Sequence, residues 1–255
     1  MNIEQHDTNA SGLPRIPLDL TRHKLSIALH WLPIILTSCI LPIVGYFALR
    51  YGSEDLQLRI ILSPWLALMG VVSLYSLLTR SWALIRRDST CRPLAQTSRW
   101  GMDFFGWNFV FGFLMLTALI SAGISTQNLT VVSLPTSVLM LYVCFELVLV
   151  QVIMAMGLQA PIRFSSIQKG SAVRPGTYVI CEDIVAVDGK RGQAFRQAWN
   201  DRYEASAVFR LHLRRMDLLW GISGLAIVAI IWGLVFGLSD TRVKREIVYS
   251  IGERS

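Results

Sequence analysis

The amino-acid sequence predicts an all-α membrane protein. We expect a helical bundle of about five transmembrane helices, with a short strand-like segment and an interfacial helix in the last cytoplasmic loop. Hydrophobic residues make up 53% of the 255 residues and charged residues only 16%, which is too apolar for a water-soluble domain of this length. Several uncharged stretches also reach the roughly 20 residues that cross a bilayer.

The first two predicted helices follow a cytoplasmic N-terminal arm, residues 1–24. Residues 25–49 contain no Asp, Glu, Lys or Arg, and residues 60–79 form a second uncharged stretch. Basic residues lie directly after the first stretch and on both sides of the second: Arg50, Arg59 and Arg80. Such residues anchor helix ends at the membrane surface.

Two further helices complete the membrane region, residues 25–158. No charged residue occurs between Phe104 and Glu146, a run too long for one helix. The polar residues 125–128 interrupt that run and predict a turn. Pro135 then falls in the first turns of the fourth helix, where proline disturbs a helix least.

The fifth predicted helix, residues 217–239, follows a long loop at 159–216, and residues 240–255 form a C-terminal tail. Three quarters of the 24 Lys and Arg residues lie on the side that contains the N-terminal arm and this loop. The positive-inside rule therefore places the N-terminus in the cytoplasm. We expect an integral protein of the endomembrane system or plasma membrane, with membrane lipids rather than nucleic acid as the partner of its basic loops.

Asn128, Leu129 and Thr130 form a glycosylation sequon, which this topology places on the lumenal side. Asn128 is therefore a candidate glycosylation site. The four cysteines form no C-x-x-C pair, and the histidines do not show the spacing of haem or diiron ligands. We expect no metal and no cofactor.

Glu146 is the candidate catalytic residue. It falls about 15 residues into the fourth predicted helix, near the bilayer midplane at about 1.5 Å per residue. An ionised carboxylate there is costly, so its side chain should face the bundle interior, find a donor or stay protonated. Tyr142, one turn earlier, is a candidate donor. A buried polar contact between helices is the alternative interpretation.

The cytoplasmic loop contains the most distinctive sequence. Residues 177–187 are rich in β-branched residues and follow Pro175 and Gly176, which predicts a strand after a turn. On a strand, Glu182 and Asp183 would point to opposite faces and would not act as a close pair. With Asp188, these acids are candidate partner-binding residues.

Residues 193–215 predict a helix that continues directly into the fifth transmembrane helix. Phe195, Trp199 and Tyr203 share one face of it and should pack on the membrane surface or on the strand. Several arginines surround this stripe, which suits an interfacial helix bound to lipid phosphates. The candidate interface residues are Phe195, Trp199, Tyr203, Arg210, Arg214 and Arg215, and Arg196 and Arg202 lie among them.

The loop also carries a resemblance to a known family. The run from Pro175 to Gly189, containing Glu-Asp-Ile-Val-Ala-Val-Asp-Gly, is followed by Phe195-Arg196 and by residues 202–206. It resembles a family of uncharacterised fungal (ascomycete) integral membrane proteins with a cytoplasmic E-D-x-V-A-V-D-G loop. The resemblance implies the same layout of helices, loop and final helix. The resemblance transfers no catalytic residues, and it implies a link to fungal secondary-metabolite biosynthesis.

Three functions remain open at this stage. The leading hypothesis is an accessory or scaffold component whose cytoplasmic loop contacts a protein partner. The second is a small membrane-embedded enzyme acting on a lipophilic substrate, such as a terpene-cyclase-like isomerase that uses Glu146 as proton donor. The third is a transporter, for which one buried acid and no clear inverted repeat give little support.

Overall fold

The computed structural model describes residues 12–17, 58–94, 96, 101–126 and 128–252, together with isolated positions between 24 and 44. Over these residues the regular structure is helical and contains no strand, only isolated bridges. The all-α prediction is confirmed. The first predicted crossing, residues 25–49, lies largely outside the described residues.

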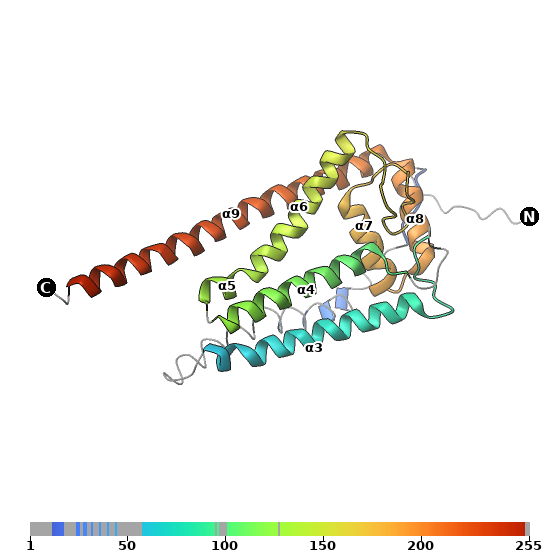
Figure 1. The fold of residues 1–255 in the computed structure, drawn as a ribbon. Helices are drawn as coiled ribbons and strands as arrows, with labels where there is room; N and C mark the ends of the chain where they lie inside the picture. The colour runs from blue at the N-terminus through green and yellow to red at the C-terminus, as the bar shows by residue number, and fades with distance from the viewer. Residues whose placement is uncertain are drawn as a thin grey trace, which may run out of the picture.

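Four long helices run lengthwise and form the bundle (Figure 1). Helix α6 packs along α9, and α4 packs against both α3 and α6. A short helix, α5, joins α4 to α6. The bounds of these elements are α3 Leu58–Ile85, α4 Phe104–Ser125, α5 Leu129–Ser133, α6 Pro135–Ala155 and α9 Ala207–Gly252.

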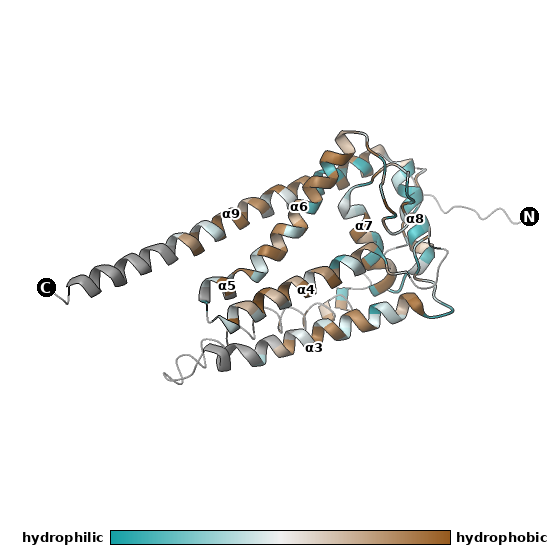
Figure 2. Ribbon diagram, in the orientation of Figure 1, coloured by the Kyte–Doolittle hydropathy of each residue, from teal (hydrophilic) through white to brown (hydrophobic). Residues whose placement is uncertain are grey.

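A polar head lies at one end of the bundle (Figures 1 and 2). We define the head as α7, η2 and α8 with the connections 86–103 and 156–175. Helix α7 spans Gly176–Asp183, η2 is a single π-helical turn at Ile184–Asp188, and α8 spans Gly192–Ala205. Figure 2 shows hydrophilic residues gathered in the head and hydrophobic residues along the bundle.

Among the described residues, three helices are long and apolar enough to cross a membrane: α4, α6 and the Ala207–Gly237 part of α9. The apolar part of α3 described in the structure is shorter, Gly70–Ile85. Large apolar side chains such as Phe111, Leu114 and Phe145 are exposed on these helices. Water would be an unfavourable neighbour for them and lipid a favourable one. The helices therefore suggest a multi-pass integral membrane protein.

The predicted turn at residues 125–128 is confirmed. Helix α4 ends at Ser125, and Asn128 caps the next helix, because its side-chain oxygen accepts hydrogen bonds from the backbone N–H groups of Thr130 (3.0 Å) and Val131 (3.3 Å). The fourth predicted helix consists of two pieces, because a break at Leu134 separates α5 from α6. Pro135 occupies the first turn of α6, where its missing N–H leaves no helical bond unmade.

Small residues bring α6 and α9 into close contact. A Cβ atom at Gly221 would lie 2.7 Å from Val148 Cγ2, and one at Gly224 would overlap Cys144 Sγ. The indole N–H of Trp232 donates to Ser137 Oγ at 2.9 Å further along the same pair. Close approach at small residues and hydrogen bonds between helices are the usual means of association inside a membrane.

The strand prediction for residues 177–187 is wrong, because this segment forms α7 and most of η2. The β-branched residues favour a strand only weakly. Here the carboxylate of Asp217 on α9 accepts hydrogen bonds from the first two backbone N–H groups of α7, at Gly176 (2.7 Å) and Thr177 (2.8 Å). Tertiary capping of the first turn therefore stabilises the helix over the local preference.

The continuous helix predicted for residues 193–215 is also wrong, since Ser206 separates α8 from α9. Ser206 has extended backbone angles, and its hydroxyl accepts a hydrogen bond from the N–H of Phe209 at 3.2 Å. Serine in that position is a typical N-cap. The break turns α8 away from the direction of α9, which lets α8 pack against α7.

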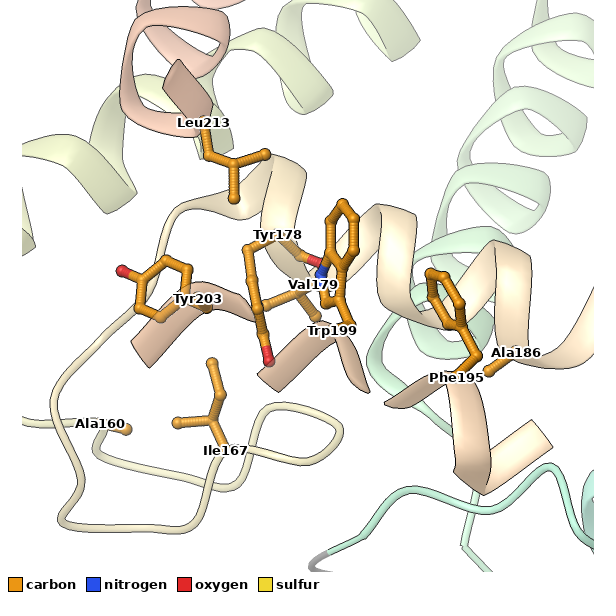
Figure 3. Close-up of a cluster of buried hydrophobic side chains, with 9 residues drawn as sticks. All are labelled: Ala160, Ile167, Tyr178, Val179, Ala186, Phe195, Trp199, Tyr203 and Leu213. Atoms are coloured by element: carbon orange, nitrogen blue, oxygen red, sulfur yellow. The ribbon is translucent and has the colours of Figure 1, made fainter. Parts of the chain in front are cut away.

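An aromatic core fills the head (Figure 3). Phe195, Trp199 and Tyr203 on α8 are buried around Tyr178 on α7. Ring centroids lie 5.5 Å apart for Phe195 and Trp199, and 4.8 Å apart for Tyr178 and Tyr203. We predicted that this stripe packs on the membrane surface or on the segment 177–187. In the structure it packs on that segment. Being buried, the three rings offer no face to lipid.

The Gly224→Ala substitution tests the α6–α9 contact. We expect overpacking against Cys144 to cost about 1–3 kcal/mol of stability. Thermal unfolding of the detergent-purified protein should show a lower Tm, and adding Cys144→Ala should recover much of the loss. Gly233→Ala is the matched control, because a Cβ there meets nothing within 4 Å among the described residues. Equal Tm values for Gly224→Ala and Gly233→Ala would contradict this packing.

Candidate functional site

A buried ionic cluster joins the head to the bundle. Its residues come from five different elements and their ends. Two arginines lie at its centre, and four carboxylates surround them. The members of this ionic cluster are Arg80, Asp103, Glu182, Asp183, Asp188 and Arg196.

The guanidinium of Arg196 on α8 is completely buried. Its Nη1 donates to Glu182 Oε1 and to Asp183 Oδ1, each at 2.7 Å. Its Nε and Nη2 donate to the backbone carbonyl of Cys91 at 3.2 and 3.1 Å, and Asp103 Oδ2 lies 3.9 Å from Nη2. One side chain therefore connects α8 to α7, to the start of α4 and to the connection that follows α3.

Arg80 on α3 is the second base of the ionic cluster. It pairs with the carboxylates of Asp103 and Asp188, and its Nη2 donates to the backbone carbonyl of Asp183 at 3.2 Å. Its guanidinium also lies 4.7 Å from the centroid of the Phe105 ring. These contacts attach the end of α3 to α4, α7 and η2.

The start of α4 is built into the same ionic cluster. Asp103 caps the helix, since its Oδ1 accepts from the N–H of Gly106 at 2.9 Å. The Oδ2 of Asp183 accepts from the N–H of Phe105 at 3.1 Å and from the hydroxyl of Ser165. Burial raises the pKa of Asp103 to about 6, with the negative charge of Asp183 acting in the same direction and Arg80 opposing both.

The strand geometry predicted for Glu182 and Asp183 does not hold, because on helix α7 the two carboxylates converge on one guanidinium. Both side chains are fully buried, so neither lies on the surface where we expected a partner to bind. Asp188 retains 31% of its side-chain exposure beside Arg80. Partner recognition by the loop stays a prediction. Because Glu182 and Asp183 are buried, exposed residues of the head would have to make the contact.

A further buried carboxylate, Asp217, lies outside the ionic cluster, where α9 leaves the head. Besides capping α7, its Oδ2 accepts from Gln151 Nε2 at 2.6 Å. A Cβ atom at Gly176 would lie 2.7 Å from Leu147 Cδ2, so a larger residue there would require the Leu147 side chain to shift. Asp217 therefore links α6, α7 and α9 at one point.

Glu146 lies on the face of α6 that meets α4, and it is partly buried. Asn108 Nδ2 on α4 lies 3.0 and 2.9 Å from the two carboxylate oxygens and donates to them. The hydroxyl of Tyr142 does not donate to Glu146 but to Asn108 Oδ1, at 2.6 Å. The polar group inside the bundle is thus a chain of Tyr142, Asn108 and Glu146, in which Asn108 is the middle member.

The arginines around α8 differ in their positions. Arg196 is buried, contrary to the expected contact with lipid phosphates. Arg210 Nη1 donates to the carbonyls of Tyr203 (2.9 Å) and Glu204 (2.7 Å), which satisfies the last turn of α8. Arg214 and Arg215 are exposed one turn before the exposed apolar residues Leu218 and Leu219. Their role at a membrane interface stays a prediction.

Sequence reasoning missed four residues that organise these sites: Arg80, Asp103, Asn108 and Asp217. The sequence analysis used Arg80 only as a basic residue at a helix end, and Asp217 only as the first residue of the fifth predicted helix. Asp103 carried a usable signal, because an aspartate directly before a long apolar run is a typical helix N-cap. Asn108 lacked such a signal, since its role depends on the partner that α6 provides. Among the described residues, no group of three or more His, Cys, Asp or Glu side chains is arranged to bind a metal ion.

The fold and its sites define a helical protein with several candidate membrane spans and a folded polar head that a buried ionic cluster holds in place. The chain's match to a protein family covers the bundle and the head together. Residues 1–254 match the model of a domain of unknown function, DUF8766, and the chain belongs to that family. Searches of curated proteins and of solved structures gave no match to the chain.

Arg196→Met tests the importance of the ionic cluster. Removing the guanidinium leaves the carboxylates of Glu182 and Asp183 buried without their base, which costs about 3–5 kcal/mol in comparable sites. We expect a much lower Tm and loss of the α7–α8 packing, measured by tryptophan fluorescence during thermal unfolding. Arg87→Met, at an exposed arginine of the same head, should leave Tm unchanged. A small, equal effect of both substitutions would contradict the role assigned to Arg196.

Proposed function

We propose that the chain is an accessory or scaffold component of a membrane-bound assembly, with the head as its binding module for a protein partner. The observation that carries this proposal is that the buried acids of the head make structural contacts. Asp103, Glu182 and Asp183 are buried and bound to arginines or backbone N–H groups, an arrangement that maintains shape. A rigid module held against the membrane suits recognition of a partner.

The outer face of α8 is the surface we propose for the partner. Gln193, Ala194 and Gln197 are exposed there, while the opposite face of α8 forms the aromatic core. The helix that presents these uncharged side chains is held in place by the aromatic core, so its backbone needs no further ordering on binding. Substitutions on this face should change recognition without disturbing the core.

We further propose five crossings with the N-terminus in the cytoplasm. The carbonyl of Pro14 accepts from Arg202 Nη1 at 3.2 Å, and Ile16 packs against the aromatic core, so this part of the arm lies at the head. Helix α3 begins at Leu58 at the opposite end of the bundle (Figure 1). The described chain therefore lies at the head before the first predicted crossing and at the opposite end of the bundle after it, which supports that crossing.

Several finer assignments belong to the same proposal. Asn128 is exposed at the end of the bundle opposite the head, and its glycosylation stays a prediction. Contact of Arg214 and Arg215 with anionic lipids also stays a prediction, as do the localisation to the endomembrane system or plasma membrane and a link to fungal secondary-metabolite biosynthesis.

Protease protection on sealed membrane vesicles tests the topology. With the cytoplasmic face outward, an N-terminal epitope tag and a tag inserted at the exposed turn 168–170 of the head should both be digested. A C-terminal tag should be protected, because five is an odd number of crossings. Digestion of both terminal tags would contradict the proposed five crossings.

Co-purification with crosslinking tests the scaffold function. Ala194→Arg and Gln197→Arg should reduce recovery of a specific partner at least about tenfold, the effect of losing roughly 1.4 kcal/mol of binding free energy. Glu146→Gln, far from this face, should leave recovery unchanged. Unaltered recovery with both α8 variants would contradict the assignment of this surface.

The alternative function is an enzyme acting on a lipophilic substrate, and the chain of Tyr142, Asn108 and Glu146 favours it. A carboxyl group hydrogen-bonded inside the bundle has the chemistry of a proton donor or relay. In that case deletion of the gene would cause a lipophilic precursor to accumulate, and wild-type protein would clear it while the Glu146→Gln variant would not. An unchanged lipid profile after deletion would contradict the enzyme.

A further inference from the structure

The ionic cluster holds more buried acids than buried bases. Asp103, Glu182 and Asp183 are 0% exposed, and the bases that face them are Arg80 and Arg196. Asp188 adds a further carboxylate that remains partly exposed. Full ionisation would therefore leave a net negative charge in the interior of the head. Uncompensated charge in such a place is strongly unfavourable, and a bound proton removes it.

The two oxygens of Glu182 have different surroundings. Its Oε1 accepts hydrogen bonds from Arg196 Nη1 at 2.7 Å and from the Ser166 hydroxyl. Its Oε2 is buried and has no hydrogen-bond partner among the described residues. A neutral carboxyl group suits this arrangement better than an ionised one, because its carbonyl oxygen accepts both bonds and an unpaired O–H costs less to bury than unpaired negative charge. An ionised group would leave half of its charge without a donor.

The other two buried acids do not share this property. Asp183 uses both oxygens, one toward Arg196 and the other toward the Phe105 N–H and Ser165. Asp103 also uses both, toward the Gly106 N–H and toward Arg80. Each oxygen of these two carboxylates therefore has a donor, which suits the ionised form. Glu182 is therefore the member of the ionic cluster whose contacts fit a neutral acid.

The titratable and charged groups around Glu182 come from every element packed against it. Tyr178 and Asp183 belong to its own helix, and Arg196 comes from α8. The remaining charged members of the ionic cluster lie behind Arg196 and are contributed by α3, by the start of α4 and by η2: Arg80, Asp103 and Asp188. No histidine belongs to the ionic cluster, so the proton resides on a carboxyl group.

We infer that Glu182 is a neutral carboxylic acid in the folded protein, with its proton on Oε2, and that this proton stabilises the packing of α7 and α8 on α3 and α4. Loss of the proton adds a negative charge to a closed interior that already contains Asp103 and Asp183. The head then separates more easily from the bundle. This inference does not depend on the scaffold function or on any partner.

The direction of the pH dependence follows from the proton. Burial raises the pKa of Glu182, in spite of the opposing charge of Arg196. The unfolded chain releases this proton near the ordinary pKa of glutamate, so the folded state binds more protons above that value and stability falls as pH rises. Asp103 acts in the same direction only up to its pKa of about 6. The part of this fall in stability that Glu182→Gln abolishes therefore reports on Glu182.

Infrared difference spectroscopy on the full-length protein in detergent detects the neutral carboxyl group directly. At about pH 7 the wild-type spectrum should contain the C=O band of a protonated carboxyl that is lost in Glu182→Gln and kept in Glu146→Gln. The Tm of wild type should fall as the pH is raised above about 7, and the Tm of Glu182→Gln should fall less over the same range. A glutamine fits the site, because its amide oxygen takes the place of Oε1.

Asp183→Asn is the matched control in the neighbouring position. Its amide group must turn N–H donors toward the N–H of Phe105 or toward Arg196, so Tm should fall at every pH. The inference is overturned if the wild-type spectrum lacks a carboxyl band sensitive to Glu182→Gln. It is also overturned if Glu182→Gln lowers Tm at about pH 7 as much as Asp183→Asn does, or fails to fold, because an ionised Glu182 would then be required.

Discussion

The guanidinium of Arg196 is the group on which the arrangement of the head depends. It is fully buried, and its donors bind acids of α7 and the Cys91 carbonyl before α4. Arginine suits this position because its donors point in fixed directions and it stays charged at any physiological pH. A buried ion pair adds little net stability compared with an apolar core, but loss of one member is costly. The ionic cluster therefore specifies the position of the head more than it adds to its stability.

The fold combines two environments that follow different rules. In the bundle, lipid can solvate the exposed apolar faces, so association depends on close contacts at Gly221 and Gly224 and on a few hydrogen bonds. In the head, burial of aromatic side chains away from water stabilises the packing. Helix α9 belongs to both, and Asp217 lies at the point of transition. A displacement of α7 would therefore act directly on α6 and α9.

The sequence predicted the parts of this protein that depend on local composition. The apolar runs, the turn before Asn128 and the helical stripe of Phe195, Trp199 and Tyr203 all correspond to observed features. The prediction failed where contacts with residues distant in the sequence determine the local structure. Residues 177–187 form a helix because Asp217 caps them from α9, and Glu182 faces inward because Arg196 lies opposite. No pattern within either segment contains that information.

Hydrogen–deuterium exchange of the full-length protein in lipid nanodiscs tests the central claim most directly. If the ionic cluster fixes the head to the bundle, the amides of α7 and α8 should be protected about as strongly as those of α4 and α6, because all four helices open in one cooperative unit. Rapid exchange throughout α7 and α8, with α4 and α6 still protected, would show that the head is not held in this way and would contradict the account.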